Sequence, residues 1–297
     1  MAAPCAAARE ALVRKALVFG GSGQLGVPVI DRLLAEGWEV VALSRGPQAA
    51  RERLHWLRGD LQQTPALPAR VEAIFSLGPL DHFARWYAHA EVEAPRVVAF
   101  GSTSIDTKQA SADARERELA ARLGEAESRL FARARDRLSA ATVLRPTLVY
   151  GAARDLTLTR IAQLARRTGF FLLPRDANGL RQPVHVQDLA GAAMAAFGSE
   201  AAAGRSYALP GGETLGYAQM VERVLAALQP PARLIRVPAP AFRAALATAH
   251  ALGRMRGLGD AALARMAEDL VFDAEAARRD FGYAPRPFNP AASMFGL

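Results

Sequence analysis

The sequence predicts an α/β fold in which a doubly wound parallel sheet carries a smaller, mostly helical lobe. Three observations favour this fold. A glycine-rich turn at residues 20–26 joins an apolar run to a helical pattern, strand-like runs alternate with helical patterns up to residue 151, and helical patterns dominate afterwards. Such alternation is typical of parallel sheets that helices cover on both faces. A chain of 297 residues is long enough for one large domain with an attached lobe.

The first half contains six short apolar runs that we interpret as strands, at residues 15–20, 39–43, 55–57, 72–77, 97–101 and 142–144. Helical patterns lie between them at residues 24–36, 81–93 and 111–138. Gly37 follows the first of these helices, where a C-terminal cap glycine belongs. We therefore expect residues 14–151 to form the sheet domain.

The second half is predicted to be mostly helical, at residues 155–167, 187–197, 216–228, 238–256, 260–270 and 273–280. Short apolar pieces interrupt these patterns at residues 170–173, 205–209 and 234–237. We expect residues 152–297 to form a lobe interleaved with the sheet domain. Segments near residues 182–210 should return to the sheet domain. The lobe should close over the carboxyl ends of the strands, where open α/β sheets bind ligands.

The glycine-rich turn predicts a phosphate-binding loop. Gly20, Gly23 and Gly26 follow a strand-like run and open a helix. One glycine permits the sharp turn, the next permits close approach to a phosphate, and the third permits the helix to pack close to the sheet. The helix N-terminus then faces the anion. We expect the whole loop to bind a dinucleotide, through Gly20, Ser22, Gly23, Gln24, Leu25 and Gly26.

Composition excludes several other classes of protein. The net charge is +8, but the arginines are scattered along helical patterns and interleaved with acidic residues, as at residues 115–118, so we expect no nucleic-acid partner. Cys5 is the only cysteine, which rules out an internal disulfide and a cysteine metal site, and no histidine–acid cluster predicts a metal. No apolar stretch is long enough to span a membrane. We expect a cytoplasmic protein that acts on a small molecule.

Seven motifs follow one another in an order that resembles a known family. They are the glycine loop and residues 59–61 (GDL), 77–79 (LGP), 100–104 (FGSTS), 144–151 (LRPTLVYG), 182–190 (QPVHVQDLA) and 281–288 (FGYAPRPF). The chain resembles the short-chain dehydrogenase/reductase superfamily, in particular its extended and atypical branches of the nucleotide-sugar epimerase/dehydratase type. The resemblance extends from about residue 14 to residue 288 and implies a Rossmann fold.

The resemblance also implies roles for residues at the cofactor. Asp60 would accept a hydrogen bond from the adenine amino group, with Leu61 against the ring, although Asp60 can also serve as a turn or cap residue. Further positions would lie along the ribose and nicotinamide, namely Leu77, Gly78, Pro79 and Pro146. His185 and Asp188 resemble landmarks of packing and helix capping. A homodimer, paired through long helices beside the fifth strand, is also implied.

The second strand indicates which dinucleotide is bound. Sites that prefer NAD place an acidic residue there to hold the ribose hydroxyls. This chain has Ser44 and Arg45 instead. An arginine can pair with the 2′-phosphate of NADP, and the serine can add a hydrogen bond. We therefore predict NADP, with NAD as the alternative, while Arg45 can also be an ordinary surface arginine.

The superfamily's usual catalytic Tyr-x-x-x-Lys pair is absent from the sequence. The alignment of the 125–127 segment with the acidic residues behind that lysine puts Leu119 and Leu123 in the two positions. The candidate substitutes are Thr103 and Ser102 after the fifth strand and Tyr87 on the helix after the fourth. The hydroxyls can also cap a turn, and Tyr87 can be a packing residue. Arg181 is the candidate for binding a substrate phosphate, or a rim arginine.

Two functions remain open from the sequence. The first is an NADP-dependent oxidoreductase or epimerase that acts on a polar, nucleotide-sugar-like metabolite with non-standard catalytic residues. The alternative is a non-catalytic dinucleotide-binding protein, either a redox sensor or a structural or assembly subunit. The complete set of cofactor motifs favours the first, and the missing Tyr–Lys pair favours the second.

Overall fold

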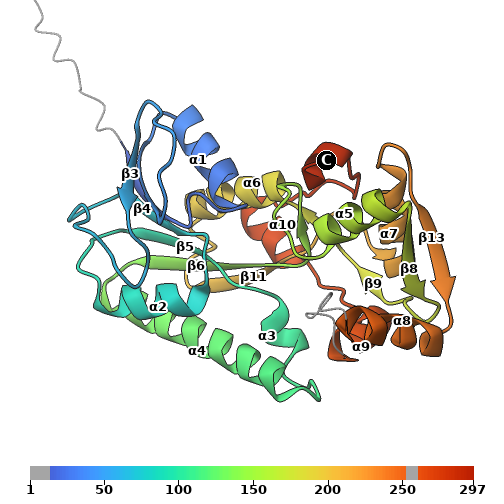
Figure 1. Ribbon diagram of the computed structural model, residues 1–297. Helices are drawn as coiled ribbons and strands as arrows, with labels where there is room; N and C mark the ends of the chain where they lie inside the picture. The colour runs from blue at the N-terminus through green and yellow to red at the C-terminus, as the bar shows by residue number, and fades with distance from the viewer. Residues whose placement is uncertain (1–13, 252–259) are drawn as a thin grey trace, which may run out of the picture.

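The computed structural model describes residues 14–251 and 260–297. Cys5 and residues 252–256 of the helix expected at 238–256 lie outside the described residues. The described chain forms a sheet domain and a smaller lobe side by side (Figure 1). Among the described residues, no helix has the length and apolar character needed to cross a membrane.

The central sheet has seven parallel strands in the order β11-β6-β5-β4-β1-β2-β3. The strands are β1 (Lys15–Phe19), β2 (Glu39–Ser44), β3 (Leu54–Arg58), β4 (Ala73–Ser76), β5 (Arg96–Phe100), β6 (Ala140–Pro146) and β11 (Arg205–Leu209). The chain order reverses between β1 and β4, and such a reversal opens a crevice at the carboxyl ends of the strands. The predicted doubly wound α/β fold is confirmed.

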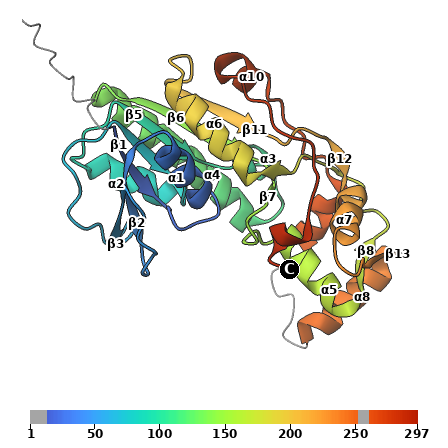
Figure 2. The ribbon, with the colours of Figure 1, turned by 90° about the horizontal axis from the view of Figure 1, so that it is seen from above.

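Both faces of the sheet are buried, which explains why its strands are continuous apolar runs. In β1, Ala16 and Val18 face one core, while Leu17 and Phe19 face the other. Helices α1 (Gly26–Ala35), α6 (Val186–Gly198) and α10 (Glu275–Phe281) cover the first face. Helices α2 (Leu80–His89) and α4 (Ala114–Asp136) cover the second, as Figures 1 and 2 show from two directions.

The lobe has its own apolar core. Strands β8 (Phe170–Pro174) and β13 (Arg233–Val237) pair in parallel, and helices α5 (Leu158–Thr168) and α7 (Tyr217–Ala226) pack with them around buried residues such as Leu173 and Met220. The described lobe also contains α8 (Ala239–Ala251), α9 (Asp260–Ala267) and a 3-10 helix η1 (Ala292–Phe295). Four two-residue strands form two further pairs: β7 (Val149–Tyr150) with β10 (Val184–His185), and β9 (Leu180–Arg181) with β12 (Leu215–Gly216).

The segment around residues 182–210 returns to the sheet. After β10, α6 packs on the first face of the sheet, and β11 then pairs with β6 as the outermost strand. Two contacts hold this return in place. The His185 ring nitrogen Nδ1 accepts a hydrogen bond of 3.2 Å from the Gln187 amide at the start of α6. Asp188 pairs with Arg286 at 2.8 Å, which ties the C-terminal segment to the same helix.

Candidate functional site

The glycine loop has a backbone that only glycine can form at two positions. Gly20 has a φ of +75°, and a Cβ atom there would lie 2.9 Å from the carbonyl carbon of Leu77. A Cβ atom at Gly26 would lie 2.2 Å from the carbonyl oxygens of both Gly20 and Gly21. The third glycine therefore allows α1 to begin directly against the loop, with its N-terminus toward the crevice.

The far side of this crevice is open. A Cβ atom at Gly78 would meet nothing within 4 Å, although Gly78 follows β4 immediately beside the glycine loop. Within the loop, the side-chain oxygen Oε1 of Gln24 is buried without a partner among the described residues. Space for a chain-like ligand beside a cradle of glycines fits a dinucleotide, with the expected loop residues on one side and Leu77, Gly78 and Pro79 on the other.

The second and third strands end beside this loop. Ser44 is buried at the end of β2, where its hydroxyl lies 3.4 Å from the Ser22 hydroxyl and accepts a hydrogen bond of 3.2 Å from the Gln48 side chain. Arg45 is exposed and close enough to Asp60 to help lower the pKa of that carboxyl group. The structure thus places a serine and an arginine at the crevice where NAD-preferring sites have an acidic residue.

Asp60 caps the turn that follows β3. Its Oδ1 atom accepts hydrogen bonds from the amides of Gln62 and Gln63, at 2.8 and 2.9 Å. These two bonds are the main cause that lowers the pKa of Asp60. The second carboxylate oxygen, Oδ2, is not used by the turn, so the capping role and the expected adenine contact are compatible. Leu61 packs at the edge of the second core.

Helix α4 contains Leu119 and Leu123, the two positions at which the sequence alignment expects the catalytic pair. Leu123 is buried in the second core, and Leu119 packs against it. One turn further along α4, buried Glu127 forms a two-bond ion pair with Arg145, with distances of 2.7 and 2.5 Å, and accepts a third hydrogen bond from Ser206. This face of α4 therefore holds β6 and β11 in place and contributes no proton-transferring group from positions 119 and 123.

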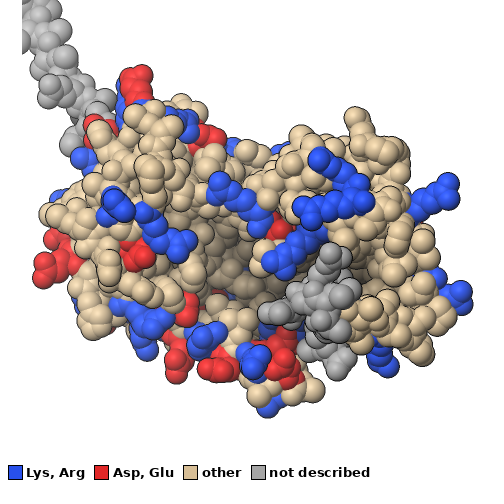
Figure 3. Space-filling model, viewed as in Figure 1, with Lys and Arg blue, Asp and Glu red and all other residues tan. Residues whose placement is uncertain are grey.

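A large cavity of about 960 Å³ lies between the carboxyl end of β5 and the lobe. Figure 3 shows this face of the molecule hollowed between the two parts, with lysine and arginine side chains around the hollow. Much of the cavity wall is apolar and comes from α5, β8, α8 and the segment after α9, including Leu164, Phe170, Phe171, Phe242, Leu246 and Phe272. The cavity can thus surround a sizeable apolar group.

Hydroxyl groups line the end of the cavity nearest the sheet. The Thr103 hydroxyl donates a hydrogen bond of 3.2 Å to the carbonyl oxygen of Pro146, so its proton is committed. The Ser102 hydroxyl accepts a bond of 3.1 Å from the Ser104 amide and donates to no acceptor within the described part of the chain, so its proton is available for another acceptor. Ser102 is therefore the better placed of the two expected hydroxyls to donate a hydrogen bond to a substrate oxygen.

The position of Tyr87 corrects the sequence analysis. Its side chain is buried in the second core, stacked on Phe83, and the guanidinium group of Arg137 lies over its ring. The hydroxyl group is buried without a hydrogen-bond partner in the described part of the chain. Because α2 turns this tyrosine toward α4 and away from the cavity, Tyr87 is a packing residue and not a catalytic candidate.

Arg181 lines the cavity, but three of the five N–H donors of its guanidinium group are already used. Its guanidinium group donates hydrogen bonds of 2.7 Å to the carbonyl oxygens of Leu180 and Glu268 and a further bond to that of Arg265. It also lies 5.1 Å from the centre of the Tyr217 ring. Burial lowers the pKa of Arg181. These contacts join the end of α9 to β9, so Arg181 organises the cavity wall.

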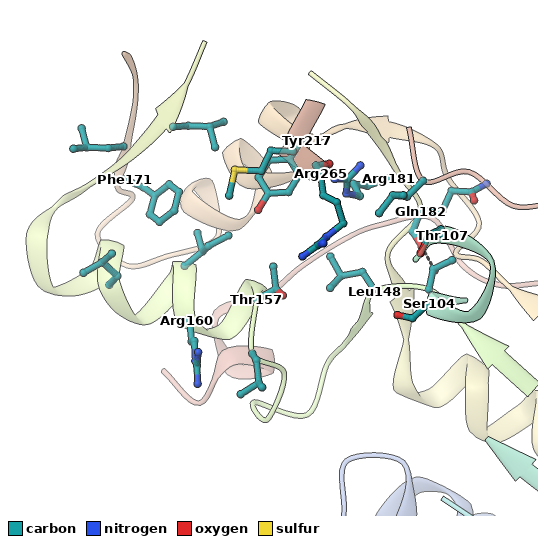
Figure 4. A pocket seen from close by; sticks show the side chains of 18 of the residues that line it. Ser104, Thr107, Leu148, Thr157, Arg160, Phe171, Arg181, Gln182, Tyr217 and Arg265 are labelled. Atoms are coloured by element: carbon teal, nitrogen blue, oxygen red, sulfur yellow. Dashed lines mark hydrogen bonds between the residues drawn. The ribbon is translucent and has the colours of Figure 1, made fainter. Parts of the chain in front are cut away.

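Several cavity residues were not singled out by the sequence. The Tyr217 ring and the Arg265 side chain extend into the cavity, and Phe171 lies at the opposite end from Ser104 (Figure 4). Arg265 pairs with Glu116 at the start of α4, and Lys108 lies 3.4 Å from the same carboxylate. These residues come from distant segments and belong to no local motif. For Tyr217, the one signal in the sequence was its place at the start of the helix predicted at residues 216–228.

Among the described residues, the histidine and acidic side chains do not gather in groups that could hold a metal ion. Within the described ranges, no group of three or more histidine, cysteine and acidic side chains is placed to hold a metal ion. His185 is buried against Tyr150, with ring centroids 5.1 Å apart, and its pKa is lowered by burial. Together with its bond to the start of α6, this packing shows His185 in a capping role.

Comparisons with known proteins agree with this geometry. Residues 16–97 match the model of the NAD dependent epimerase/dehydratase family. The chain is 28% identical to 2-alkyl-3-oxoalkanoate reductase of Stenotrophomonas maltophilia (strain K279a), over 92% of this chain and 95% of the relative.

Two solved structures show the same fold. The UDP-glucuronic acid 4-epimerase from Bacillus cereus in complex with NAD superimposes with a TM-score of 0.70 at 12% identity, covering 95% of this chain and 98% of that one. Epimerase Mth375 from Methanothermobacter thermautotrophicus superimposes with a TM-score of 0.70 at 15% identity, covering 95% and 91%. The expected resemblance to epimerase/dehydratase-type proteins with an NAD-binding Rossmann domain is confirmed.

Proposed function

We propose that this protein, which resembles the epimerase/dehydratase type of short-chain dehydrogenase/reductase, is an oxidoreductase that interconverts a carbonyl and a hydroxyl group on a substrate with a large apolar portion. One observation carries the proposal. A single cavity runs from the hydroxyl groups after β5, beside the expected nicotinamide end at Pro146, to an apolar wall in the lobe.

The character of that wall supports an apolar substrate. A phenylalanine-rich surface gains free energy by covering aliphatic or aromatic groups, whereas a diphosphate and sugar hydroxyls require many convergent polar partners. The relative from Stenotrophomonas is named as a reductase of 2-alkyl-3-oxoalkanoates, which contain alkyl chains beside a ketone. A substrate of that general kind fits both ends of the cavity.

A nucleotide-sugar-like substrate is the second candidate, as expected from the sequence. The cations Lys108, Arg160 and Arg265 line the cavity, and such groups can pair with a diphosphate. The pairing of Lys108 and Arg265 with Glu116 reduces the charge available for a ligand. We therefore favour the apolar substrate.

The chain's own residues would position the substrate and supply one hydrogen bond to its reacting oxygen. When bound, the dinucleotide would supply or accept the hydride. The Ser102 hydroxyl would donate a hydrogen bond to the substrate oxygen at the reacting carbon, and the bond between Thr103 and Pro146 holds this corner rigid. Leucine side chains at positions 119 and 123 carry no proton, so in this proposal the Ser102 hydroxyl passes the proton to the substrate oxygen and regains one from solvent.

We further propose NADP as the preferred dinucleotide, with NAD as the alternative. Ser44 and Arg45 stand at the end of β2, where they can contact a 2′-phosphate. Cytoplasmic location and homodimer formation stay predictions. A purely dinucleotide-binding, non-catalytic protein remains the competing hypothesis, because α4 lacks the usual catalytic pair.

The proposal is tested by binding followed by turnover. Purified protein is titrated with NADPH and NADH by fluorescence, and reduction of 2-alkyl-3-oxo acids of increasing chain length is compared with conversion of UDP-sugars. We expect turnover of the 3-oxo acids to improve with chain length. Phe171→Asn should raise KM for long-chain substrates about tenfold while it leaves short-chain substrates unchanged. Dinucleotide binding without turnover of either class would favour the non-catalytic hypothesis.

A further inference from the structure

A contact that no cofactor motif accounts for joins the lobe side of the crevice to the glycine loop. Arg154 lies in the segment between β7 and α5, and its guanidinium group donates a hydrogen bond to the backbone carbonyl oxygen of Ser22. Ser22 is in the middle of the glycine loop, 132 positions earlier in the chain. A cation from the segment before α5 therefore contacts the glycine loop.

The segment before Arg154 has a fixed backbone. Gly151 has a φ of +109° and packs so closely on the His185 ring that a Cβ atom would lie 2.5 Å from its Nε2. Ala153 adopts a left-handed φ of +55°, which is rare for a residue with a side chain. Its amide donates a hydrogen bond of 2.9 Å to the carbonyl oxygen of Met294. This conformation determines the direction in which the next residue leaves the turn.

The segment after Arg154 is anchored as well. Asp155 is buried, and its Oδ1 atom accepts hydrogen bonds of 3.0 Å from the amides of Thr157 and Thr159. Its other oxygen, Oδ2, accepts a bond of 2.5 Å from the Thr159 hydroxyl. Asp155 is thus occupied by the start of α5 and does not neutralise its neighbour. Arg154 projects from between two anchored residues.

The charge of Arg154 is not balanced by a local carboxylate. In residues 14–251 and 260–297, Arg154 takes part in no ion pair, and its one hydrogen bond goes to a neutral carbonyl oxygen. A guanidinium group has five N–H donors, so most remain available for an anion at the mouth of the loop. Arginine binds phosphate oxygens strongly because its donors match their geometry.

We propose that Arg154 binds the pyrophosphate of the dinucleotide from the lobe side, opposite the amides of the glycine loop. This role rests on the proposed dinucleotide function and extends it, because it makes the turn after β7 part of the cofactor site. Arg45 faces the separate position of the 2′-phosphate at the end of β2. Arg154 would therefore contribute equally to the binding of NADH and NADPH.

The test compares dinucleotide affinities of Arg154→Gln and Arg154→Lys with the unmodified protein, by NADH and NADPH fluorescence. We expect Arg154→Gln to weaken binding of both dinucleotides about tenfold, and Arg154→Lys to weaken both by less, because it keeps the charge. ADP-ribose used as a competitor should lose affinity to the same extent, while adenosine, which lacks phosphate, should not. Arg166→Gln, an exposed arginine of α5 outside the cavity lining, is the matched control.

Each outcome decides the proposal. Unchanged affinity in Arg154→Gln, or a loss confined to NADPH, overturns it. Loss of adenosine binding as well would show that the substitution disturbs the glycine loop as a whole, which also overturns it. If the unmodified protein binds the dinucleotides but turns over no substrate, the catalytic proposal fails while the role of Arg154 stands. If it binds neither dinucleotide, both fail.

Discussion

The two ends of the crevice are built in different ways. At the glycine-loop end, the essential features are backbone conformations, such as the positive φ of Gly20 and the contact of Gly26 with the carbonyl oxygens of Gly20 and Gly21. At the cavity end, they are side chains from α5, β8, α8 and α9 that lie far apart in the sequence. The first end tolerates almost no change, whereas the second can change its ligand through single substitutions. This difference would allow the proposed cofactor site to resemble that of other proteins while the proposed substrate site differs from theirs.

The largest effect is expected from a substitution in the glycine loop. Gly26→Ala places a methyl group 2.2 Å from two carbonyl oxygens, so α1 must move away from the loop. We expect dinucleotide affinity to fall by about 100-fold or more and the free energy of unfolding to fall by about 1–3 kcal/mol. Fluorescence titration and urea unfolding measure the two effects.

Gly124→Ala is the matched control for that substitution. Gly124 lies inside α4, where a Cβ atom would have its nearest neighbour, Ile105 Cδ1, at 3.7 Å. Alanine should therefore stabilise the helix by about 0.5–1 kcal/mol and leave dinucleotide binding unchanged. If Gly26→Ala behaved like this control, the glycine loop would not be the rigid end of the crevice.

The next largest effect is expected where the two ends meet. Ser102→Ala removes the cavity hydroxyl whose proton is uncommitted. For a substrate that the enzyme turns over, kcat should fall about 100-fold, while the Kd for NADPH stays the same. Ser104→Ala removes a neighbouring cavity hydroxyl and should have little effect on kcat. Equal losses in both variants would argue against a specific role for Ser102.

A smaller effect concerns the choice of dinucleotide. Arg45→Glu replaces a cation at the end of β2 by the acidic type of residue that holds ribose hydroxyls in NAD sites. The ratio of NADPH to NADH affinity should shift toward NADH by about tenfold. Arg70→Glu, an exposed change before β4, serves as the control. An unchanged ratio would show that Arg45 is a surface arginine that does not contact the dinucleotide.

The smallest effect concerns the ion cluster that joins α4 to α9. Burial by itself raises the pKa of Glu116, but the hydrogen bond from Ser111 and the charges of Arg265 and Lys108 outweigh it and hold this pKa below its ordinary value of 4.5. A carboxyl group with a lowered folded-state pKa stabilises the fold above its unfolded-state pKa. This contribution is lost as the pH falls through the folded-state pKa.

We therefore expect Glu116→Gln to lower the free energy of unfolding by about 1 kcal/mol at neutral pH, and this difference should shrink as the pH falls below 4.5 and through the folded-state pKa. Urea unfolding of both proteins at several pH values measures the difference. Asp113→Asn, which changes only a cap at the start of α4, is the comparison. A difference between Glu116→Gln and the unmodified protein that persisted in acid would show that the ion cluster is not its cause.

The sequence predicted features that depend on neighbouring residues. The glycine loop and the alternation of strands and helices depend on local backbone preferences and on apolar patterns, and the structure has both. The spacing of Leu80, Phe83, Ala84 and Tyr87 places these residues on one apolar face of α2. The sequence could not show whether that face packs in a core or lines a cleft, and the structure packs it in the second core. Nor could the sequence predict that three Arg181 donors bond to the carbonyl oxygens of Leu180, Arg265 and Glu268.

By itself, then, the sequence determined the fold class, the glycine-rich turn between a strand and a helix, and the absence of a Tyr-x-x-x-Lys pair. These features are read from residues that are adjacent or at fixed spacing, since glycine conformations and helix periodicity are local. Only the tertiary structure decided the apolar cavity, the free proton of Ser102 and the reach of Arg154 to Ser22. Those features depend on how distant segments pack, and packing is determined by the shape of the whole chain.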